Sequence, residues 1–216
     1  GEAVAQGWNN AMQIIQLIAA NARYFSGIST RPVIECSQGD CAASMCIDFY
    51  GRFQEEAVKR STGEESRLVF ITPKGGSTVS CDPIGMLRGA PHPELAQAFI
   101  TYVLSPEGQN LWNYKVGEPG GPEQYALRRA PIRRDSYQPD LAKHRSDPTI
   151  NPYQDAMESG FVYHGAWTGR LFTPLRFIIK TAFIDPRNEL VAAWSAIIQA
   201  ENEGRTAQAT AARKIF

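Results

Sequence analysis

Hydrophobic residues in this sequence either recur at the spacing typical of helices or stand in short apolar runs typical of buried strands. The longest helical stripe follows Pro93 and consists of Leu95, Ala96, Phe99, Ile100, Val103 and Leu104. This spacing predicts an amphipathic helix with one buried side, and Pro93 suits its first turn because a missing N–H costs nothing there. The sequence Ser105-Pro106-Glu107 supplies a capping residue, a proline and an acid, which predicts that a second helix starts at this corner.

Helical spacing also predicts three other helices and a helical or frayed C-terminal end. Apolar residues three and four positions apart indicate helices over residues 8–20, 171–182 and 186–198. The last of these follows Asp185, a capping residue, and begins with a proline at its first position. Residues 201–216 are rich in alanine and charge, which predicts a peripheral helix or a frayed tail.

Apolar runs without helical spacing predict strands. Residues 45–50 form such a run, apolar except for Asp48, and residues 68–71 form another. Residues 78–87, after a Gly-rich turn, are predicted as a further strand, delayed by Asp82-Pro83. The polar residues 51–67 are predicted as a surface helix or a loop. Strands that alternate with helices predict an α/β fold class.

Composition and charge exclude some classes of protein. The 216 residues suffice for one large domain or two small lobes, and 43% of them are hydrophobic, enough for a core. Lysine plus arginine equal aspartate plus glutamate at 22 each, so the basic excess of a nucleic-acid binder is missing and we expect no nucleic-acid partner. No run approaches the roughly 20 apolar residues that span a bilayer, so we expect no membrane insertion.

One basic cluster stands out in the Gly- and Pro-rich segment 117–147, which we expect to be irregular. It consists of Arg128, Arg129, Arg133 and Arg134. A solvated loop around Pro131 is the favoured interpretation, and an anion-binding surface for an interaction partner is the alternative.

The chain has four cysteines, namely Cys36, Cys41, Cys46 and Cys81. The first three are spaced C-x4-C-x4-C, unlike the C-x2-C pairs of structural zinc sites, and we expect neither a metal site among them nor a cofactor. Their even number is compatible with disulfides in an oxidising compartment, with three possible connectivities. A buried free thiol is an equally good interpretation of Cys46, which lies in an apolar run.

Residues 89–109 resemble a segment of bacterial solute-binding proteins, the receptors of ABC importers, in the iron(III)-type branch of family 1. The resemblance rests on an alanine and a proline before the helix, an alanine and a phenylalanine within it, and the sequence Leu-Ser-Pro-Glu-Gly-Gln after it. Residues 7–25, 38–51, 68–87 and 190–197 are similar to further motifs of this family. Each motif is weak alone, but their order along the chain is that of the family.

The resemblance implies a type II periplasmic-binding-protein fold, in which each α/β lobe has a mixed sheet flanked by helices. The order of the motifs implies the C-terminal portion of such a protein, with the first lobe largely missing. Residues 1–66 would then belong to the second lobe, residues 67–115 to a segment crossing towards the first lobe, and residues 116–216 to a helical and irregular part packed on the lobes. The chain starts almost inside a helix without a secretion signal, so we expect that a preceding segment has been removed.

The resemblance also implies binding rather than catalysis. Such receptors close two lobes over a small molecule or ion and deliver it to a membrane permease, in the periplasm, at the cell envelope or outside the cell. Known ligands of relatives include anionic organic solutes and ferric iron, and both classes stay open for this chain. A missing lobe would leave an apolar face exposed and allow a homodimer.

Asp48 and Tyr50 are candidate ligand-binding residues. In iron-binding members of the family, a tyrosine pair at the end of the strand matching residues 45–50 supplies phenolate oxygens to Fe(III). Phe49 breaks that pair here, but Asp48 and Tyr50 still offer oxygen atoms and would share one face of a strand. The alternative is that both side chains only satisfy hydrogen bonds at the end of a buried strand.

Ser29, Thr30, Asn21 and Arg23 are the other candidates. Ser29 and Thr30 lie in a hydroxyl-rich loop, a composition that suits anions where free N–H groups point outward. A plain turn is the alternative for these two residues. For Asn21 and Arg23 the alternatives are a helix C-cap and a solvated charge.

Two other functions are alternatives to solute transport. An enzyme would need Cys46 or Cys81 as nucleophile and one of the three histidines, His92, His144 or His164, as base, and no Gly-x-Ser-x-Gly motif is present. We therefore expect no enzymatic activity. A ligand-sensing input domain of a receptor would keep the same fold and differ only in its output.

Overall fold

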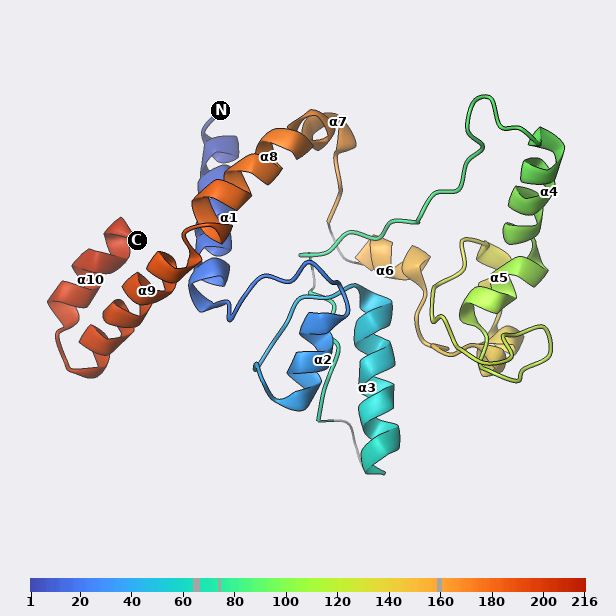
Figure 1. The fold of residues 1–216 in the computed structure, drawn as a ribbon, viewed down its shortest axis with the longest axis horizontal. Coiled ribbons are helices and arrows are strands. Elements are labelled where there is room, and N and C mark those ends of the chain that lie inside the picture. The colour runs from blue at the N-terminus through green and yellow to red at the C-terminus, as the bar shows by residue number, and fades with distance from the viewer. Residues whose placement is uncertain (64–66, 74, 159–160) are drawn as a thin grey trace. The chain divides into compact units, whose positions relative to one another are not determined.

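The computed structural model describes residues 1–63, 67–73, 75–158 and 161–216, and within these ranges it is built from helices and irregular backbone (Figure 1). The chain divides into two compact units. Unit 1 consists of residues 1–27 and 164–216, and unit 2 of residues 28–163. The segment boundaries expected from the family, at 66/67 and 115/116, stay a prediction.

Unit 1 brings the two ends of the chain together. Its helical segments are α1 (Glu2–Asn21), α7 (Gly165–Thr168), η3 (Gly169–Leu171), α8 (Phe172–Ile179), η4 (Lys180–Ile184), α9 (Arg187–Asn202) and α10 (Thr206–Ile215). Helix α1 packs against α9, and α9 turns back into α10 (Figure 1). Ile197, Ala200 and Ala209 form the buried centre of the α9–α10 pair, covered by Trp194 and Phe216.

Unit 2 contains the remaining helices. They are α2 (Arg31–Gln38), α3 (Asp48–Thr62), α4 (Pro93–Val103), α5 (Pro106–Asn113), η1 (Arg134–Tyr137), η2 (Pro139–His144) and α6 (Pro152–Glu158). Helices α2 and α3 lie side by side (Figure 1), and Gln54 Nε2 joins them by donating to Ser37 Oγ at 2.9 Å. The described residues between α3 and α4, 67–73 and 75–92, follow non-helical backbone (Figure 1).

The predicted α/β class, with a mixed sheet flanked by helices, is wrong for the residues that the structure describes. No strand forms in these ranges, and the single β-type contact is an isolated bridge between Tyr114 and Arg145. Residues 68–71 and 78–87 follow irregular backbone, because strand-forming side chains give a stable strand only when a neighbouring strand pairs with them.

The failure of residues 45–50 to form the predicted strand also has a local explanation. A short apolar run fits a strand and a helical turn equally well, and here its second half opens α3. Asp48 lies in the first turn, where a carboxylate interacts favourably with the helix dipole, and it pairs with Arg52 one turn later at 2.6 Å. These local interactions favour the helix.

The predicted helices are confirmed, except that Pro186 and not Asp185 takes the N-cap position of α9, which begins at Arg187. The stripe after Pro93 forms α4, and Ser105 caps α5 by accepting a hydrogen bond from the Gly108 N–H at 3.1 Å. The prediction that one side of α4 is buried is wrong, however. None of its residues is buried, and Leu95 and Phe99 are 70% and 59% exposed. No helix among the described residues is long and apolar enough to cross a membrane.

Candidate ligand-binding groove

Unit 2 contains an open groove of about 2060 Å³. Its walls come from α2, the start of α3, described residues of 67–84, the α4–α5 corner and residues 129–132. Pockets that enclose one small molecule measure roughly 300–1,000 Å³, so a single small ligand would fill only part of this groove. The charged residues along it are Asp48, Arg52, Arg67, Asp82, Arg129, Asp155 and Glu158.

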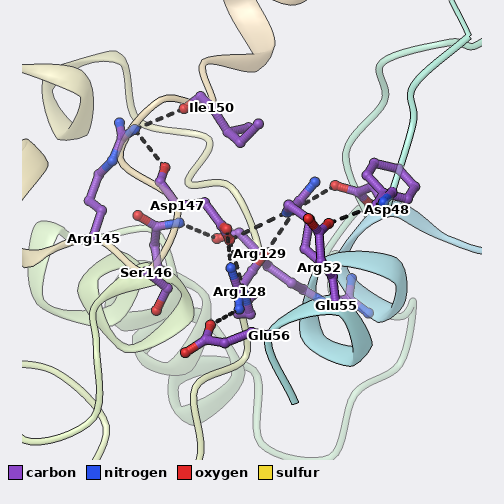
Figure 2. Close-up of polar contacts among 12 residues, drawn as sticks. Asp48, Arg52, Glu55, Glu56, Arg128, Arg129, Arg145, Ser146, Asp147 and Ile150 are labelled. Atoms are coloured by element: carbon purple, nitrogen blue, oxygen red, sulfur yellow. Dashed lines mark hydrogen bonds and ion pairs between the residues drawn. The ribbon is translucent and has the colours of Figure 1, made fainter. Parts of the chain in front are cut away.

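A buried charge cluster joins α3 to the segments that follow α5 (Figure 2). Asp147 lies between two arginines: Arg52 Nε is 3.3 Å from Asp147 Oδ2, and Arg128 Nε donates to the same oxygen at 3.1 Å. Arg128 also pairs with Glu56. Arg52, Arg128 and Asp147 are each 9% exposed or less. Burial of an isolated charge is unfavourable, so each of these groups depends on its partners to stay charged inside the protein.

Arg145 contributes a third buried cation next to this cluster (Figure 2). Its Nη2 donates to the carbonyl oxygens of Asp147 and Ile150, each at 2.9 Å, and its guanidinium carbon lies 4.8 Å from the centre of the Tyr137 ring. Arg145 thereby fixes the backbone at Asp147 and just after it, next to the carboxylate that pairs with Arg52 and Arg128.

Arg128 adopts a backbone conformation that side-chain-bearing residues rarely take. Its φ of +57° is the one positive value among the described residues other than glycine. This conformation persists only where the surroundings hold it. Ion pairs to Asp147 and Glu56 hold the side chain, and Arg52 Nη2 donates to the Arg128 carbonyl at 3.2 Å. This turn in the backbone places two consecutive arginines in different environments. Arg128 is buried, whereas Arg129 lines the groove.

The backbone of Arg129 is held by α5. Its N–H donates to the Trp112 carbonyl at 2.9 Å, and Asn113 Nδ2 donates to the Arg129 carbonyl at 3.2 Å. The guanidinium carbon of Arg129 lies 4.1 Å from the centre of the Phe49 ring and 5.8 Å from that of Trp112, and both rings line the groove. Asp82, which is exposed, forms an ion pair with this guanidinium. The result is a cation–π arrangement on the groove wall.

The prediction that Asp48 and Tyr50 share one face is wrong. They lie in the first turn of α3, where residues two positions apart point about 200° apart around the helix axis. Asp48 lines the groove and pairs with Arg52. Tyr50 packs against Phe49, with 4.3 Å between ring centres, and is not among the described residues that line the groove. The binding roles of Asp48 and Tyr50 stay predictions.

The other four candidates are divided between the two units. Asn21 and Arg23 lie in unit 1, and Ser29 and Thr30 lie in unit 2 just before α2. Asn21 Nδ2 donates to the Leu17 carbonyl at 2.8 Å, which is the C-capping alternative, and Asn21 also borders a shallow groove of about 500 Å³ in unit 1. Ser29 is exposed and Thr30 occupies the N-cap position of α2. Their roles in ligand binding stay predictions.

All four cysteines line the groove of unit 2. Burial raises the pKa of the Cys46 thiol, and the neighbouring Asp48 and Cys36 raise it further, so Cys46 is a poor nucleophile. Disulfide pairing of Cys36, Cys41, Cys46 and Cys81 stays a prediction. In the described part of the chain, no three side chains of His, Cys, Asp or Glu are grouped so that they could hold a metal ion.

The histidines considered as catalytic bases have other contacts. His144 Nδ1 is 2.6 Å from Glu118 Oε2, and its ring stacks on Tyr114. His164 stacks on Trp167 with 4.1 Å between ring centres and belongs to unit 1, whereas all four cysteines belong to unit 2. His92 precedes α4 at its N-cap position.

Sequence reasoning missed the Arg52–Asp147–Arg128 cluster. The interpretation of Arg128 as part of a solvated loop is wrong, because only 8% of this residue is exposed. Its partners lie 19 and 72 positions away along the chain, and no spacing rule connects residues so far apart. The one signal available was the unusual density of arginine around Pro131.

Comparison with known proteins identifies the family. Residues 5–135, more than half of the chain, match the family described as "Bacterial extracellular solute-binding protein". The chain belongs to this family. Residues 5–135 of this solute-binding family member include α2–α5, much of the groove, and both Arg128 and Arg129.

One curated relative is similar to part of this solute-binding chain. A putrescine/agmatine-binding protein of Pseudomonas aeruginosa is 25% identical over 117 residues, which is 54% of this chain and 31% of the relative. The match thus spans about a third of the relative's length. No solved structure matches the chain.

Proposed function

We propose that this chain forms part of a receptor that captures a small organic ion and delivers it to the permease of an ABC importer, in the periplasm, at the cell envelope or outside the cell. Family membership over residues 5–135 is the observation that carries this proposal. It favours transport over the ligand-sensing alternative. Because the family consists of binding proteins, we propose no catalytic step.

The groove of unit 2 is the proposed ligand site. Its aromatic residues Phe49 and Trp112 suit the apolar part of a small molecule, and its charged residues suit the polar end. Asp48 is the sequence-predicted candidate that lines this groove. Tyr50, Ser29, Thr30, Asn21 and Arg23 remain candidate ligand-binding residues of the proposed receptor.

An anionic organic solute is the first ligand class that we propose. Arg67 and Arg129 line the groove, and neither belongs to the buried Arg52–Asp147–Arg128 cluster. Guanidinium groups bind carboxylate and phosphonate oxygens through two parallel hydrogen bonds. Ferric iron has less support, since Phe49 offers no oxygen where iron-binding relatives have a tyrosine.

An organic diamine is the second ligand class. The curated relative is named a putrescine/agmatine-binding protein, and the groove is also lined by Asp155 and Glu158. Burial raises the pKa of Asp155, and the nearby Glu158 raises it further. A bound ammonium group would offset this repulsion between carboxylates.

A thermal-shift comparison tests the proposal. The chain is heated with succinate, methylphosphonate, putrescine, agmatine or ferric ion, each in large excess. A ligand at one hundred times its dissociation constant stabilises the folded state by about 2.7 kcal/mol, which for a chain of this size raises Tm by roughly 5–10 °C. Asp48→Asn should reduce the shift given by putrescine, agmatine or ferric ion, because it removes a carboxylate that would attract a cation, whereas Asp40→Asn, outside the groove-lining set, should retain it. A Tm that no compound moves would count against the proposal.

A further inference from the structure

We propose that Arg129 is the anion-binding residue of the groove, and that Asp82 occupies the position of the ligand's anionic group until the ligand arrives. This inference rests on the proposed function and narrows it. The ligand would carry a carboxylate or a phosphonate, since both present two oxygens that match a guanidinium.

The first support is the fixed position of Arg129. Its N–H and carbonyl are both hydrogen-bonded to the end of α5, at Trp112 and Asn113. The preceding residue, Arg128, is locked in its left-handed conformation by Asp147 and Glu56. A binding group whose backbone is already ordered loses less entropy when the ligand binds.

The second support is the setting of the guanidinium. It stacks over Phe49 at 4.1 Å and lies near Trp112, so its plane is held by aromatic rings that also line the groove. One third of the Arg129 side chain, 34%, stays exposed. The cation is therefore partly desolvated by the rings and still accessible to a ligand in the groove.

The third support is the nature of its partner. Asp82 is 79% exposed and belongs to the irregular stretch between α3 and α4. An exposed ion pair contributes only about 0–1 kcal/mol, so a ligand anion with further contacts in the groove can displace Asp82. Arg128 differs from Arg129 in its partner. Its partner Asp147 is buried, and if a ligand displaced Asp147, two buried arginines would lose their shared counter-charge.

Isothermal titration with succinate and with methylphosphonate tests this assignment on the full chain. We expect one of the two anions to bind, which also distinguishes a carboxylate from a phosphonate ligand. Arg129→Gln should weaken that binding at least tenfold, and Arg129→Lys should weaken it less, because lysine keeps the charge but loses the paired hydrogen bonds. Asp82→Asn should strengthen it by up to about fivefold by removing the competing carboxylate.

Arg133→Gln is the matched control. Arg133 is also 34% exposed and ion-paired, with Asp135, but it is not among the described residues that line the groove. Tm values of all variants show whether each one folds.

If the wild type binds an anion and Arg129→Gln binds it equally well, or if Asp82→Asn binds it less well, the Arg129 assignment is wrong and the receptor function stands. If the wild type binds putrescine and neither anion, the assignment is also wrong. If it binds no solute at all, the proposed function fails with it.

Discussion

Asp147 is the carboxylate on which the buried charges of unit 2 depend. It contacts the guanidinium groups of Arg52 and Arg128, and all three residues are almost inaccessible to solvent. A buried ion pair contributes little compared with a well-packed apolar pair, but loss of one partner leaves an uncompensated buried charge. The cluster therefore makes unit 2 sensitive to single substitutions.

We expect Asp147→Asn to destabilise the protein by about 3–5 kcal/mol, because two buried arginines lose their shared counter-charge. Urea unfolding followed by circular dichroism measures this free energy. Glu203→Gln is the control, since Glu203 forms an exposed ion pair with Arg205 and should contribute about 0–1 kcal/mol. Equal effects of the two substitutions would show that Asp147 does not hold the cluster together.

The pair formed by Glu118 and His144 predicts a pH dependence of stability. The hydrogen bond from His144 lowers the pKa of Glu118 below its ordinary value of 4.5. A carboxylate whose pKa is lower in the folded state stabilises the protein above the unfolded pKa, and this contribution disappears as pH falls through the folded pKa. The wild type should thus lose more Tm than Glu118→Gln between about pH 6 and pH 3. Parallel Tm curves for the two proteins would contradict this prediction.

Helices were predictable from the sequence because their signals are local. The spacing of apolar residues in 8–20 and 93–104 predicted α1 and α4, and the capping residue Ser105 predicted the start of α5. The absence of strands at residues 68–71 and 78–87 was not predictable, because such segments form a strand only if another segment pairs with them. A pattern within one segment carries no information about that partner.

The corner between α4 and α5 gives a test at the scale of one element. Ser105 Oγ accepts the Gly108 N–H and also donates to the Tyr102 carbonyl at 2.7 Å, so one hydroxyl ends one helix and begins the next. Ser105→Ala should cost about 1 kcal/mol of unfolding free energy, whereas Ser105→Thr, which keeps the hydroxyl, should cost less. Equal losses for alanine and threonine, measured by urea unfolding, would rule out the capping role.

The candidate site was predictable only in part, for a similar reason. Asp48 was found because it lies where the resembling iron-binding receptors have their tyrosine pair, and it does line the groove. Arg129 was seen only as one of several loop arginines. Its position depends on Phe49, Asp82 and Trp112, which lie far from it in the chain and come together only in the folded unit.

The whole chain combines a family assignment with one groove that fits it. Residues 5–135 place the chain among bacterial extracellular solute-binding proteins, and the groove of unit 2 is lined largely by residues of this matched range. The buried charge cluster fixes the backbone from which Arg129 reaches that groove. Unit 1 has a separate small core between α9 and α10. The central claim is that this molecule binds one small organic ion.

Native mass spectrometry of the purified chain tests that claim most directly. The protein is sprayed from a volatile buffer alone and then with excess succinate, methylphosphonate, putrescine or agmatine, and is gently unfolded in the gas phase. We predict one added small organic ion per chain, lost on unfolding and absent when the chain is unfolded beforehand. A chain that stays bare with every compound, while it remains folded, would contradict the solute-binding function.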